Sequence, residues 1–233
     1  MTNNPVDSTV LQQQAKTRQE IETAITQMFA PEDEGLRHAL VAAKEGGLPE
    51  IQISAIQGKL LQLLATACNA HKILEIGSLA GYSGIWLARA LPTSGRLITL
   101  EINPKHAEVV RGSFAAAGIA DRTEVRVGQA LELLPHLESE APFDFFFIDA
   151  DKAPYPQYLA WAIRLSRPGS IIVADNCIRR GAALHETEGM NADTAGLVQY
   201  NKHASGDARL VSLALAMDED YTDGFTISVV RQA

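Results

Sequence analysis

The sequence predicts an α/β fold in which a doubly wound, mostly parallel sheet follows a helical N-terminal extension. From residue 72 onward, short apolar runs of strand length alternate with helical patterns. A glycine-rich turn joins the first of these runs to a helix, whereas the first 70 residues show helical patterns alone. The chain has 233 residues, 46% of them apolar, which suffices for one domain with a sizeable core. We expect a helical extension over residues 1–70 and a sheet region over 71–233.

The sequence of the extension predicts three helices. The first runs from Ser8 to Met28, and the second runs from about Glu32 to Lys44. Ser54 followed by Gln57 is a capping-box pattern that predicts the start of the third. The first helix carries a stripe of apolar residues that suits a helix lying on a surface, at Val10, Leu11, Ile21, Ala24, Ile25 and Met28.

The first predicted strand, Ile73–Ile76, runs directly into a corner with glycines at positions 77, 81 and 84. A helical pattern begins at Ser83 and continues until Pro92 stops it. Backbone N–H groups and the positive helix end at such a corner can face a polar ligand. The second glycine comes four residues after the first, so the dinucleotide fingerprint G-x-G-x-x-G is not matched. A tight turn without a ligand is the alternative.

The remaining chain predicts four more parallel strands and a closing hairpin. The last two strands are linked by the acidic turn Asp218–Asp223, which is too short for a crossover and favours antiparallel pairing. The expected sheet is therefore Rossmann-like, with five parallel strands and a terminal antiparallel hairpin, seven strands in all. The predicted strands are Arg96–Glu101, Thr123–Val127, Phe143–Asp149, Ser170–Ala174, Arg209–Leu215 and Gly224–Arg231, and the helices between them are Pro104–Ala117, Ala130–Leu137, Pro156–Leu165 and Asp193–His203.

Charge and cysteine content exclude several function classes. The net charge of −8 disfavours a nucleic-acid partner, because proteins that bind phosphates are usually basic. The two cysteines, Cys68 and Cys177, lie far apart and predict neither a disulfide framework nor a metal knuckle. The polar N-terminus lacks the apolar core of a signal peptide, and no apolar run has the length of a membrane span. We therefore expect a soluble, cytoplasmic protein without a membrane partner.

Polar residues stand where the predicted parallel strands end, which is the edge where open α/β sheets bind ligands. The second strand ends in Glu101, whose carboxylate can accept both hydroxyls of a ribose, and the third leads into the small residues Gly128–Ala130, which can lie against an adenine ring. The fourth strand is followed by Asp149–Lys152, and the fifth by Asp175 and Asn176. A lone acid at a strand end is more often a helix cap or a turn former, which is the alternative for each position.

Asp149, Asp175 and Asn176 together predict a divalent cation site. Two carboxylates and a carboxamide oxygen are hard ligands, which suit Mg²⁺ best, with Mn²⁺ or Ca²⁺ as alternatives. Without a cation, carboxylates at adjacent strand ends would repel each other. Three protein oxygens leave coordination positions for water and for a chelating substrate.

Four segments occur in order along the chain: EIGSLAGYS, LEINP, FIDADK and ADN. Together they resemble the motifs of the cation-dependent O-methyltransferases, which include the plant caffeoyl-CoA type, bacterial relatives and the animal catechol enzyme. The likeness runs from about Gln52 to Val230. It implies an S-adenosylmethionine-dependent enzyme that methylates a vicinal diphenol of the catechol or caffeoyl type. It also implies a homodimer formed through the N-terminal helices.

The resemblance implies roles for individual residues as well. Lys152 would be the catalytic base, and Asp149, Asp175 and Asn176 would hold the metal. The residues expected to contact S-adenosylmethionine are Glu75, Gly77, Ser78, Ser83, Glu101, Ala130 and Asp151.

Two positions depart from the family pattern. Arg179, followed by Arg180, stands where the plant enzymes carry a tryptophan against the substrate ring. Ile53 stands where they carry a threonine that touches the cofactor. Arginine side chains suit a carboxylate or phosphate on the tail of the acceptor, and solvated loop charges are the alternative. Both departures concern the substrate and leave the reaction class unchanged.

Two other function classes stay open at this point. The first is an oxidoreductase that binds NAD at the same corner, against which the glycine spacing argues. The second is a binding protein that has the methyltransferase fold but no turnover. The presence of Lys152 and the complete set of metal ligands argues against that second class.

Overall fold

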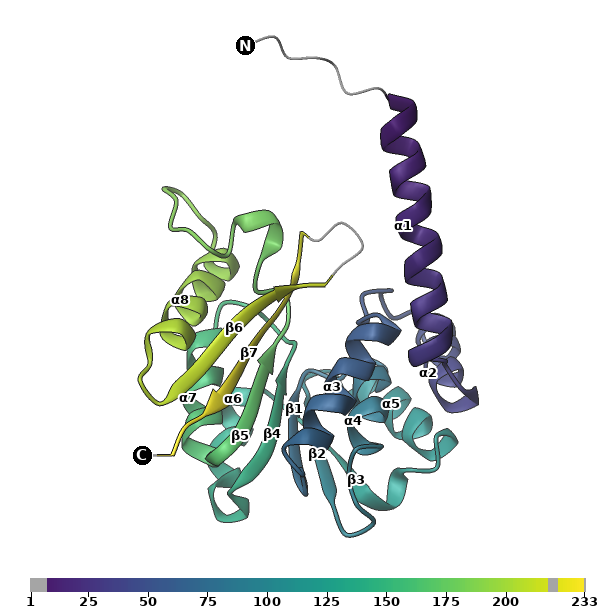
Figure 1. Cartoon of the computed structure of the whole chain (residues 1–233). Coiled ribbons are helices and arrows are strands. Elements are labelled where there is room, and N and C mark those ends of the chain that lie inside the picture. Colours follow the sequence, from purple (N-terminus) through teal and green to yellow (C-terminus); the bar gives the residue numbers. More distant parts are fainter. Residues whose placement is uncertain (1–7, 218–221, 233) are drawn as a thin grey trace.

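A seven-stranded mixed sheet lies at the centre of the protein (Figure 1). The computed structural model describes residues 8–217 and 222–232, so most of the predicted turn Asp218–Asp223 lies outside the described residues. The first five strands in sheet order run parallel, and β7 is antiparallel to both of its neighbours, which confirms the predicted fold class. In that order the strands are β3 (Thr123–Val127), β2 (Arg96–Glu101), β1 (Lys72–Ile76), β4 (Phe143–Ile148), β5 (Ser166–Ala174), β7 (Gly224–Val230) and β6 (Leu210–Ala216).

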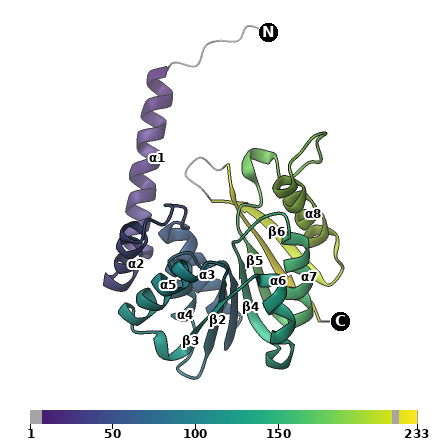
Figure 2. The same cartoon turned by 180° about the vertical axis from the view of Figure 1, so that it is seen from behind.

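Helices cover both faces of the sheet (Figures 1 and 2). Helices α3, α4 and α5 pack on one face, and α6, α7 and α8 pack on the other. Strand β4 is apolar throughout for this reason, because Phe145 and Phe147 join the first layer while Phe146 and Ile148 join the second. The helices are α1 (Ser8–Phe29), α2 (Glu34–Glu45), α3 (Ala55–Ala67), α4 (Tyr82–Ala88), α5 (Pro104–Ala116), α6 (Ala130–Leu133), α7 (Tyr155–Leu165) and α8 (Ala192–Gly206).

The N-terminal extension forms the three predicted helices. The capping box of α3 is complete, since the Gln57 backbone N–H donates to Ser54 Oγ at 3.2 Å and the Ser54 N–H donates to Gln57 Oε1 at 2.7 Å. Helix α2 begins at the cap residue Asp33 and packs against α4 and α5. These contacts attach the end of the extension firmly to the sheet region.

Helix α1 extends away from the rest of the protein (Figures 1 and 2). Its predicted apolar stripe is not buried within the chain, because Ile21 is 54% exposed, Ile25 42% and Met28 73%. The side chains of Val10 and Leu11 lie outside the described residues. Among the helices that the structure describes, none is long and apolar enough to cross a membrane.

Several predicted boundaries were wrong. The helix predicted over Ala130–Leu137 is α-helical for one turn and continues as a 3₁₀-helix over Leu134–Glu140, because Pro135 has no N–H to donate to the preceding turn. Strand β5 begins at Ser166 instead of Ser170. Pro168 and Gly169 lie within the strand although both residues are typical of turns, so the sequence does not indicate that the strand begins before them. The pairing of β5 with β4 shifts register nearby. Helix α4 also ends earlier than predicted, at Ala88.

Candidate active site

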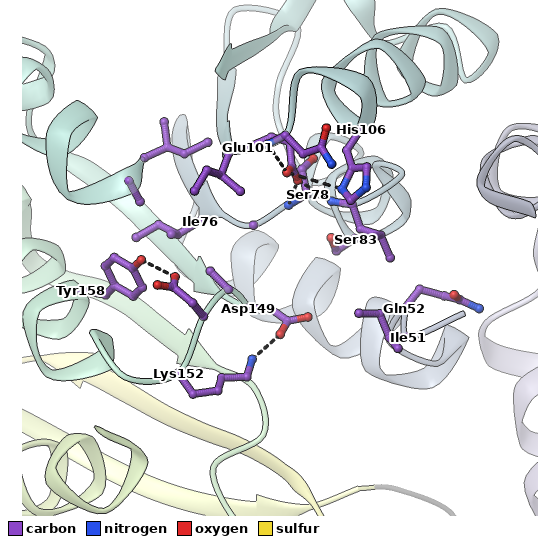
Figure 3. Close-up of a pocket in the computed structure, with 18 of the residues that line it drawn as sticks. Ile51, Gln52, Ile76, Ser78, Ser83, Glu101, His106, Asp149, Lys152 and Tyr158 are labelled. Atoms are coloured by element: carbon purple, nitrogen blue, oxygen red, sulfur yellow. Dashed lines mark hydrogen bonds and ion pairs between the residues drawn. The ribbon is translucent and has the colours of Figure 1, made fainter. Parts of the chain in front are cut away.

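A cavity of about 1010 Å³ opens at the carboxyl ends of the parallel strands (Figure 3). Its wall includes Ile76 at the end of β1, Glu101 at the end of β2, Asp149 after β4 and Asn176 after β5. Ile53, one of the two departures from the family pattern, also lines it. Most of the residues expected at the strand ends therefore line one cavity, at the edge where such sheets bind ligands, whereas Asp175 is buried and is not part of its wall.

Gly77 and Gly81 shape the turn from β1 into α4. Their φ angles are 93° and 84°, a region that residues with side chains rarely adopt. A Cβ atom at Gly77 would lie 2.0 Å from the carbonyl oxygen of Asp149. The turn can therefore approach the end of β4 only because this residue has no side chain. The same turn brings Ser78 and Ser83 to the cavity wall.

Glu75 lies behind this wall and not on it. Its side chain is fully buried, and its carboxyl accepts hydrogen bonds from Ser83 Oγ at 2.6 Å and from Ser78 Oγ at 3.5 Å. Burial raises the pKa of Glu75 to about 7, and the Ser83 hydroxyl opposes that rise. The cause is strand alternation, because Ile73 and Glu75 face the α4 layer while Leu74 and Ile76 face the other. Glu75 thus reaches the cavity through the two serines that it holds.

Glu101 is fixed by backbone hydrogen bonds. One carboxylate oxygen accepts from the N–H groups of Ser78 at 3.3 Å and Leu79 at 3.0 Å, and the other accepts from Asn103 N–H at 2.9 Å. His106 Nδ1 lies 3.6 Å from the second oxygen. The carboxylate is 5% exposed and lines the cavity (Figure 3). It therefore joins the end of β2 to the glycine-rich turn while keeping a defined position at the ligand edge.

Ala130 and Asp151 line another part of the cavity. The Tyr158 hydroxyl donates to Asp151 Oδ1 at 2.6 Å, and this pairing raises the pKa of Tyr158, already raised mainly by burial. Tyr158 and His106 were not predicted from the sequence to belong to the site. Each lies near the start of a helix that follows a strand, His106 in α5 and Tyr158 in α7. The packing of these helices against the sheet brings both side chains to the site, and no local sequence pattern predicts it.

Asp149 and Asp175 stand side by side at the ends of β4 and β5. The preceding residues, Ile148 and Ala174, are register partners, and the Asp175 N–H donates to the Ile148 carbonyl at 3.0 Å. Burial raises the pKa of Asp175 to about 7, and the neighbouring Asp149 carboxylate adds to the rise. The predicted juxtaposition of the two acids is therefore present.

Lys152 is held between an acid and a phenol. Its Nζ donates to Asp149 Oδ1 at 2.7 Å (Figure 3). The same Nζ donates to the Tyr155 hydroxyl at 2.8 Å, and Lys152 is 7% exposed. The Tyr155 hydroxyl in turn lies 3.1 Å from the carbonyl oxygen of Asp175 and 3.2 Å from that of Ile148. Tyr155, which no local pattern in the sequence predicts to be a site residue, therefore connects Lys152 to the backbone of both strand ends.

The loop after β5 carries the remaining predicted residues. Asn176 and Arg179 line the cavity, whereas Arg180 is exposed and does not line it. All three have left-handed backbone conformations, with φ angles of 57°, 44° and 53°. Such angles are unfavourable for residues with a Cβ by roughly 1–2 kcal/mol each, so surrounding contacts must maintain the loop.

The donor set fits a hard divalent cation. Within residues 8–217 and 222–232, no three or more His, Cys, Asp and Glu side chains gather closely enough to hold a metal ion. The predicted set differs from such a cluster because its third donor is the amide of Asn176. Two carboxylates and an amide, with no sulfur among them, suit Mg²⁺ or Mn²⁺. The raised pKa of Asp175 indicates a carboxylate that a nearby positive charge would stabilise.

Comparison with known proteins identifies the family. A sequence model of the family described as O-methyltransferase matches residues 27–229. A catechol O-methyltransferase of Niastella koreensis is 46% identical over 211 residues, which cover 89% of this chain and 95% of the relative. One of Mycobacterium tuberculosis (strain H37Rv) is 44% identical over 214 residues, with coverage of 91% and 96%.

A solved structure agrees with the sequence relatives. The crystal structure of the O-methyltransferase TomG from Streptomyces achromogenes in complex with SAM matches with a TM-score of 0.86 and 39% identity, over 91% of this chain and 96% of that one. The resemblance predicted from the four motifs is thereby confirmed. The chain belongs to the O-methyltransferase family and is an enzyme of the transferase class.

Proposed function

We propose that this enzyme transfers a methyl group from S-adenosylmethionine to one hydroxyl of a vicinal diphenol and requires a divalent cation. The observation that carries the proposal is one cavity that holds the glycine-rich turn with Glu101 on one side and Asp149, Lys152 and Asn176 on the other. The catechol O-methyltransferases among the relatives and the SAM complex of TomG support the same reaction.

The cofactor would bind along the turn after β1. Gly77, Ser78 and Ser83 would contact its methionine part through the backbone and the serine hydroxyls, with Glu75 holding those serines in place. Glu101 would accept the ribose hydroxyls, because its carboxylate is fixed at the cavity wall. The small side chain of Ala130 and the carboxylate of Asp151 would flank the adenine.

The acceptor would bind beside Asp149, Asp175 and Asn176, the three residues that would hold Mg²⁺, Mn²⁺ or Ca²⁺. A bound divalent cation lowers the pKa of a coordinated hydroxyl by several units and so favours the phenolate. The acceptor must lose its hydroxyl proton, because a phenolate oxygen attacks the sulfonium methyl group much faster than a phenol does. S-adenosylmethionine would supply the methyl group, which would pass from its sulfonium sulfur to that oxygen and leave a neutral thioether.

Lys152 is placed to receive the hydroxyl proton at Nζ. Its nitrogen lies against Asp149 and the Tyr155 hydroxyl, so the side chain has little freedom to leave the site. Tyr155 is fully buried, and burial raises its pKa well above that of free tyrosine. The phenol therefore stays protonated and orients Lys152 without competing for the proton. A positioned base of this kind contributes roughly 10²–10⁴-fold to a rate.

Arg179 and Arg180 would meet an anionic tail of the acceptor. Arg179 is half-buried at the cavity wall, which favours direct contact, whereas Arg180 would act at longer range from the surface.

We also propose that the enzyme acts in the cytoplasm. Its two cysteines, Cys68 and Cys177, are free thiols, and the reducing cytoplasm keeps thiols in that state.

A second copy of the chain would cover α1. Ile21, Ile25, Met28 and Phe29 are exposed along this helix, an arrangement that exposes apolar area without a partner inside the chain. We expect a homodimer by light scattering after gel filtration. The double substitution Ile21→Glu and Ile25→Glu should yield monomers, and an unchanged dimer would show that the interface lies elsewhere.

The decisive test of the reaction uses matched acceptors. With S-adenosylmethionine, we expect methylation of catechol and caffeic acid, little turnover of the corresponding monophenols, and loss of activity in EDTA that Mg²⁺ or Mn²⁺ restores. The reason is that two adjacent hydroxyls can fill two coordination positions, whereas a monophenol fills one. Full turnover in metal-stripped enzyme, checked by elemental analysis, would contradict the cation requirement. Titration with NAD tests whether the chain is instead an oxidoreductase that binds this cofactor. Any turnover of an acceptor tests whether it is instead a binding protein without catalytic activity.

A further inference from the structure

We propose that Asp223 is a positioning residue that orients the Asn176 amide so that its oxygen faces the candidate metal site. The inference rests on the metal site of the proposed function. Asn176 follows β5 and Asp223 precedes β7, so the two residues are 47 positions apart in the sequence. The antiparallel pairing of Ala174 with Thr226 brings them together at the ligand edge of the sheet.

One carboxylate oxygen of Asp223 sets the direction of the amide. Asn176 Nδ2 donates to Asp223 Oδ2 at 3.3 Å. An ionised carboxylate only accepts hydrogen bonds, so it selects the nitrogen of the amide and not the oxygen. Because the amide group is planar, fixing its nitrogen toward Asp223 turns Oδ1 away from it. Asn176 lines the cavity, so this oxygen is the ligand atom available to a cation.

The other oxygen of Asp223 holds the backbone that carries Asn176. Asp223 Oδ1 accepts from the N–H groups of Ile178 and Arg179, each at 3.1 Å, and from its neighbour Gly224 at 2.9 Å. The Cys177 N–H donates to the Gly224 carbonyl at 3.0 Å. These bonds hold a loop in which Asn176 has an unfavourable φ of 57°. Asp223 thus determines both the place of Asn176 and the orientation of its amide.

The two roles can be separated by Asp223→Asn. The new amide oxygen can still accept from the backbone N–H groups, so the loop keeps its hydrogen bonds. The new NH₂ group, however, faces the NH₂ group of Asn176, and two donors cannot bond to each other. Asn176 must then turn over or move, and an amide nitrogen does not bind a hard cation. Metal affinity should therefore fall while the fold persists.

The test measures Mn²⁺ binding by electron paramagnetic resonance on the full chain, without S-adenosylmethionine or acceptor. We expect Asp223→Asn to raise the Mn²⁺ dissociation constant by about 10–100-fold, the usual effect of removing a group that orients a ligand. Glu186→Gln, which removes an exposed carboxylate outside the site, is the matched control and should change it little. Equal affinity in Asp223→Asn and the parent would overturn the inference.

Repeating Asp223→Asn in a protein that already carries Asn176→Asp separates the loss of amide orientation from the mere loss of a negative charge. In a protein that already carries Asn176→Asp, the NH₂ group introduced by Asp223→Asn can donate to the new carboxylate at position 176. Adding Asp223→Asn to that protein should therefore raise its Mn²⁺ dissociation constant by less than about threefold. Equal losses in both backgrounds would mean that Asp223 acts only through its charge or through the loop, and would overturn the inference. A parent enzyme that does not bind Mn²⁺ would refute the metal site itself, which is a different result.

An independent measurement covers the case in which Asp223→Asn does not fold. The Asn176 side-chain amide signal can be assigned by NMR through its loss in Asn176→Asp. One of its protons is bound to Asp223, so we expect slower hydrogen exchange than for an exposed asparagine such as Asn191. Exchange at the rate of a free amide would show that Asp223 does not hold the group.

Discussion

The two halves of the cavity differ in how their carboxylates are neutralised. In the half that we propose binds the cofactor, called the cofactor half, Glu101 accepts hydrogen bonds from three backbone N–H groups, which stabilise its charge before any ligand arrives. In the half that we propose binds the acceptor, called the acceptor half, Asp149 and Asp175 stand side by side, and burial together with the Asp149 carboxylate raises the pKa of Asp175 to about 7. Before a cation binds, Lys152 supplies the nearby positive charge through its bond to Asp149, and a bound cation would take over this role and favour the neutral lysine that can accept a proton.

This difference indicates what each half is built to bind. A carboxylate already satisfied by backbone donors, with lone pairs left over, suits a neutral polyol such as ribose. Asp149 and Asp175 stand next to each other with only one lysine nearby, so burial and their mutual repulsion disfavour ionisation of both, and a cation that replaced the proton of Asp175 would relieve that repulsion. The same sheet edge thus combines a preformed polar surface with a site whose electrostatic repulsion favours a positive ligand. Substitutions should therefore affect the two halves separately.

The largest expected effect is in the acceptor half. Lys152→Ala should lower kcat by roughly 10²–10⁴-fold, because the proton acceptor is removed. The dissociation constant for S-adenosylmethionine, measured by calorimetry, should change little, since Lys152 bonds to Asp149 and Tyr155 and to no residue of the glycine-rich turn. Lys202→Ala, on the exposed surface of α8, is the control. Retention of most turnover would mean that Lys152 is not the base, and weaker cofactor binding would mean that the halves are not independent.

Glu75 provides a test inside the cofactor half, because its buried carboxyl accepts hydrogen bonds from the Ser78 and Ser83 hydroxyls instead of from backbone N–H groups. Its pKa in the folded protein is about 7, whereas its ordinary value is 4.5. As pH rises from 4.5 to 7, the unfolded chain loses this proton first, so the folded state binds more protons and its stability falls. Glu75→Gln removes this contribution. The stability of the variant relative to the parent should therefore rise with pH across this range, by up to roughly 3 kcal/mol.

Denaturant unfolding at pH 5, 6, 7 and 8 measures this difference. Asp175 has a raised pKa of the same sign, but it is present in both proteins and cancels in the comparison. Glu132→Gln, at an exposed position of α6, controls for the loss of a surface carboxyl. A constant difference between variant and parent from pH 5 to 8 would show that Glu75 is not the buried acid described here.

The fold and the residues at the strand ends could be predicted because local patterns determine them. The apolar run of β4 requires both faces to be covered, and parallel strands place Asp149 and Asp175 at the same edge. Residues that reach the site by tertiary packing could not be predicted. Tyr155 and Tyr158 arrive with the placement of α7, and Asp223 arrives with the antiparallel pairing of β7.

Misplaced boundaries and roles had physical causes as well. Pro168 and Gly169 are typical of turns, yet they lie within β5, next to the shift in its pairing with β4. Glu75 is predicted to contact the cofactor, and strand alternation directs its fully buried side chain toward α4, where it bonds to Ser78 and Ser83. The resemblance to the family predicts a role for this position, whereas the alternation of side chains along β1 determines where its side chain points. In the case of Glu75, the motif identifies the residue, and the packing of β1 determines the direction of its side chain.

A moderate effect is expected from Glu101→Gln in the cofactor half. The substitution keeps the shape of the side chain but replaces one acceptor oxygen with a donor, which faces either a backbone N–H or the ribose. We expect S-adenosylmethionine binding to weaken by about 1–3 kcal/mol, the range for a hydrogen bond to a charged group. Mn²⁺ binding should be unchanged, because Glu101 is at the end of β2 and the metal ligands follow β4 and β5. Equal cofactor affinity by calorimetry would remove Glu101 from the cofactor site.

The smallest expected effect compares two adjacent arginines of the acceptor half. Arg179 is half-buried at the cavity wall and Arg180 is exposed beyond it, so the pair is a natural matched control. An exposed or half-exposed ion pair contributes up to about 1 kcal/mol, so Arg179→Ala should raise the KM of caffeic acid by roughly fivefold at most. The KM of catechol, which has no anionic tail, should stay the same, and Arg180→Ala should change both little. Added salt should weaken the contribution of Arg179, because the charges are partly in solvent. Equal effects of Arg179→Ala on both acceptors would indicate that the loop is disturbed and that no anion is recognised there.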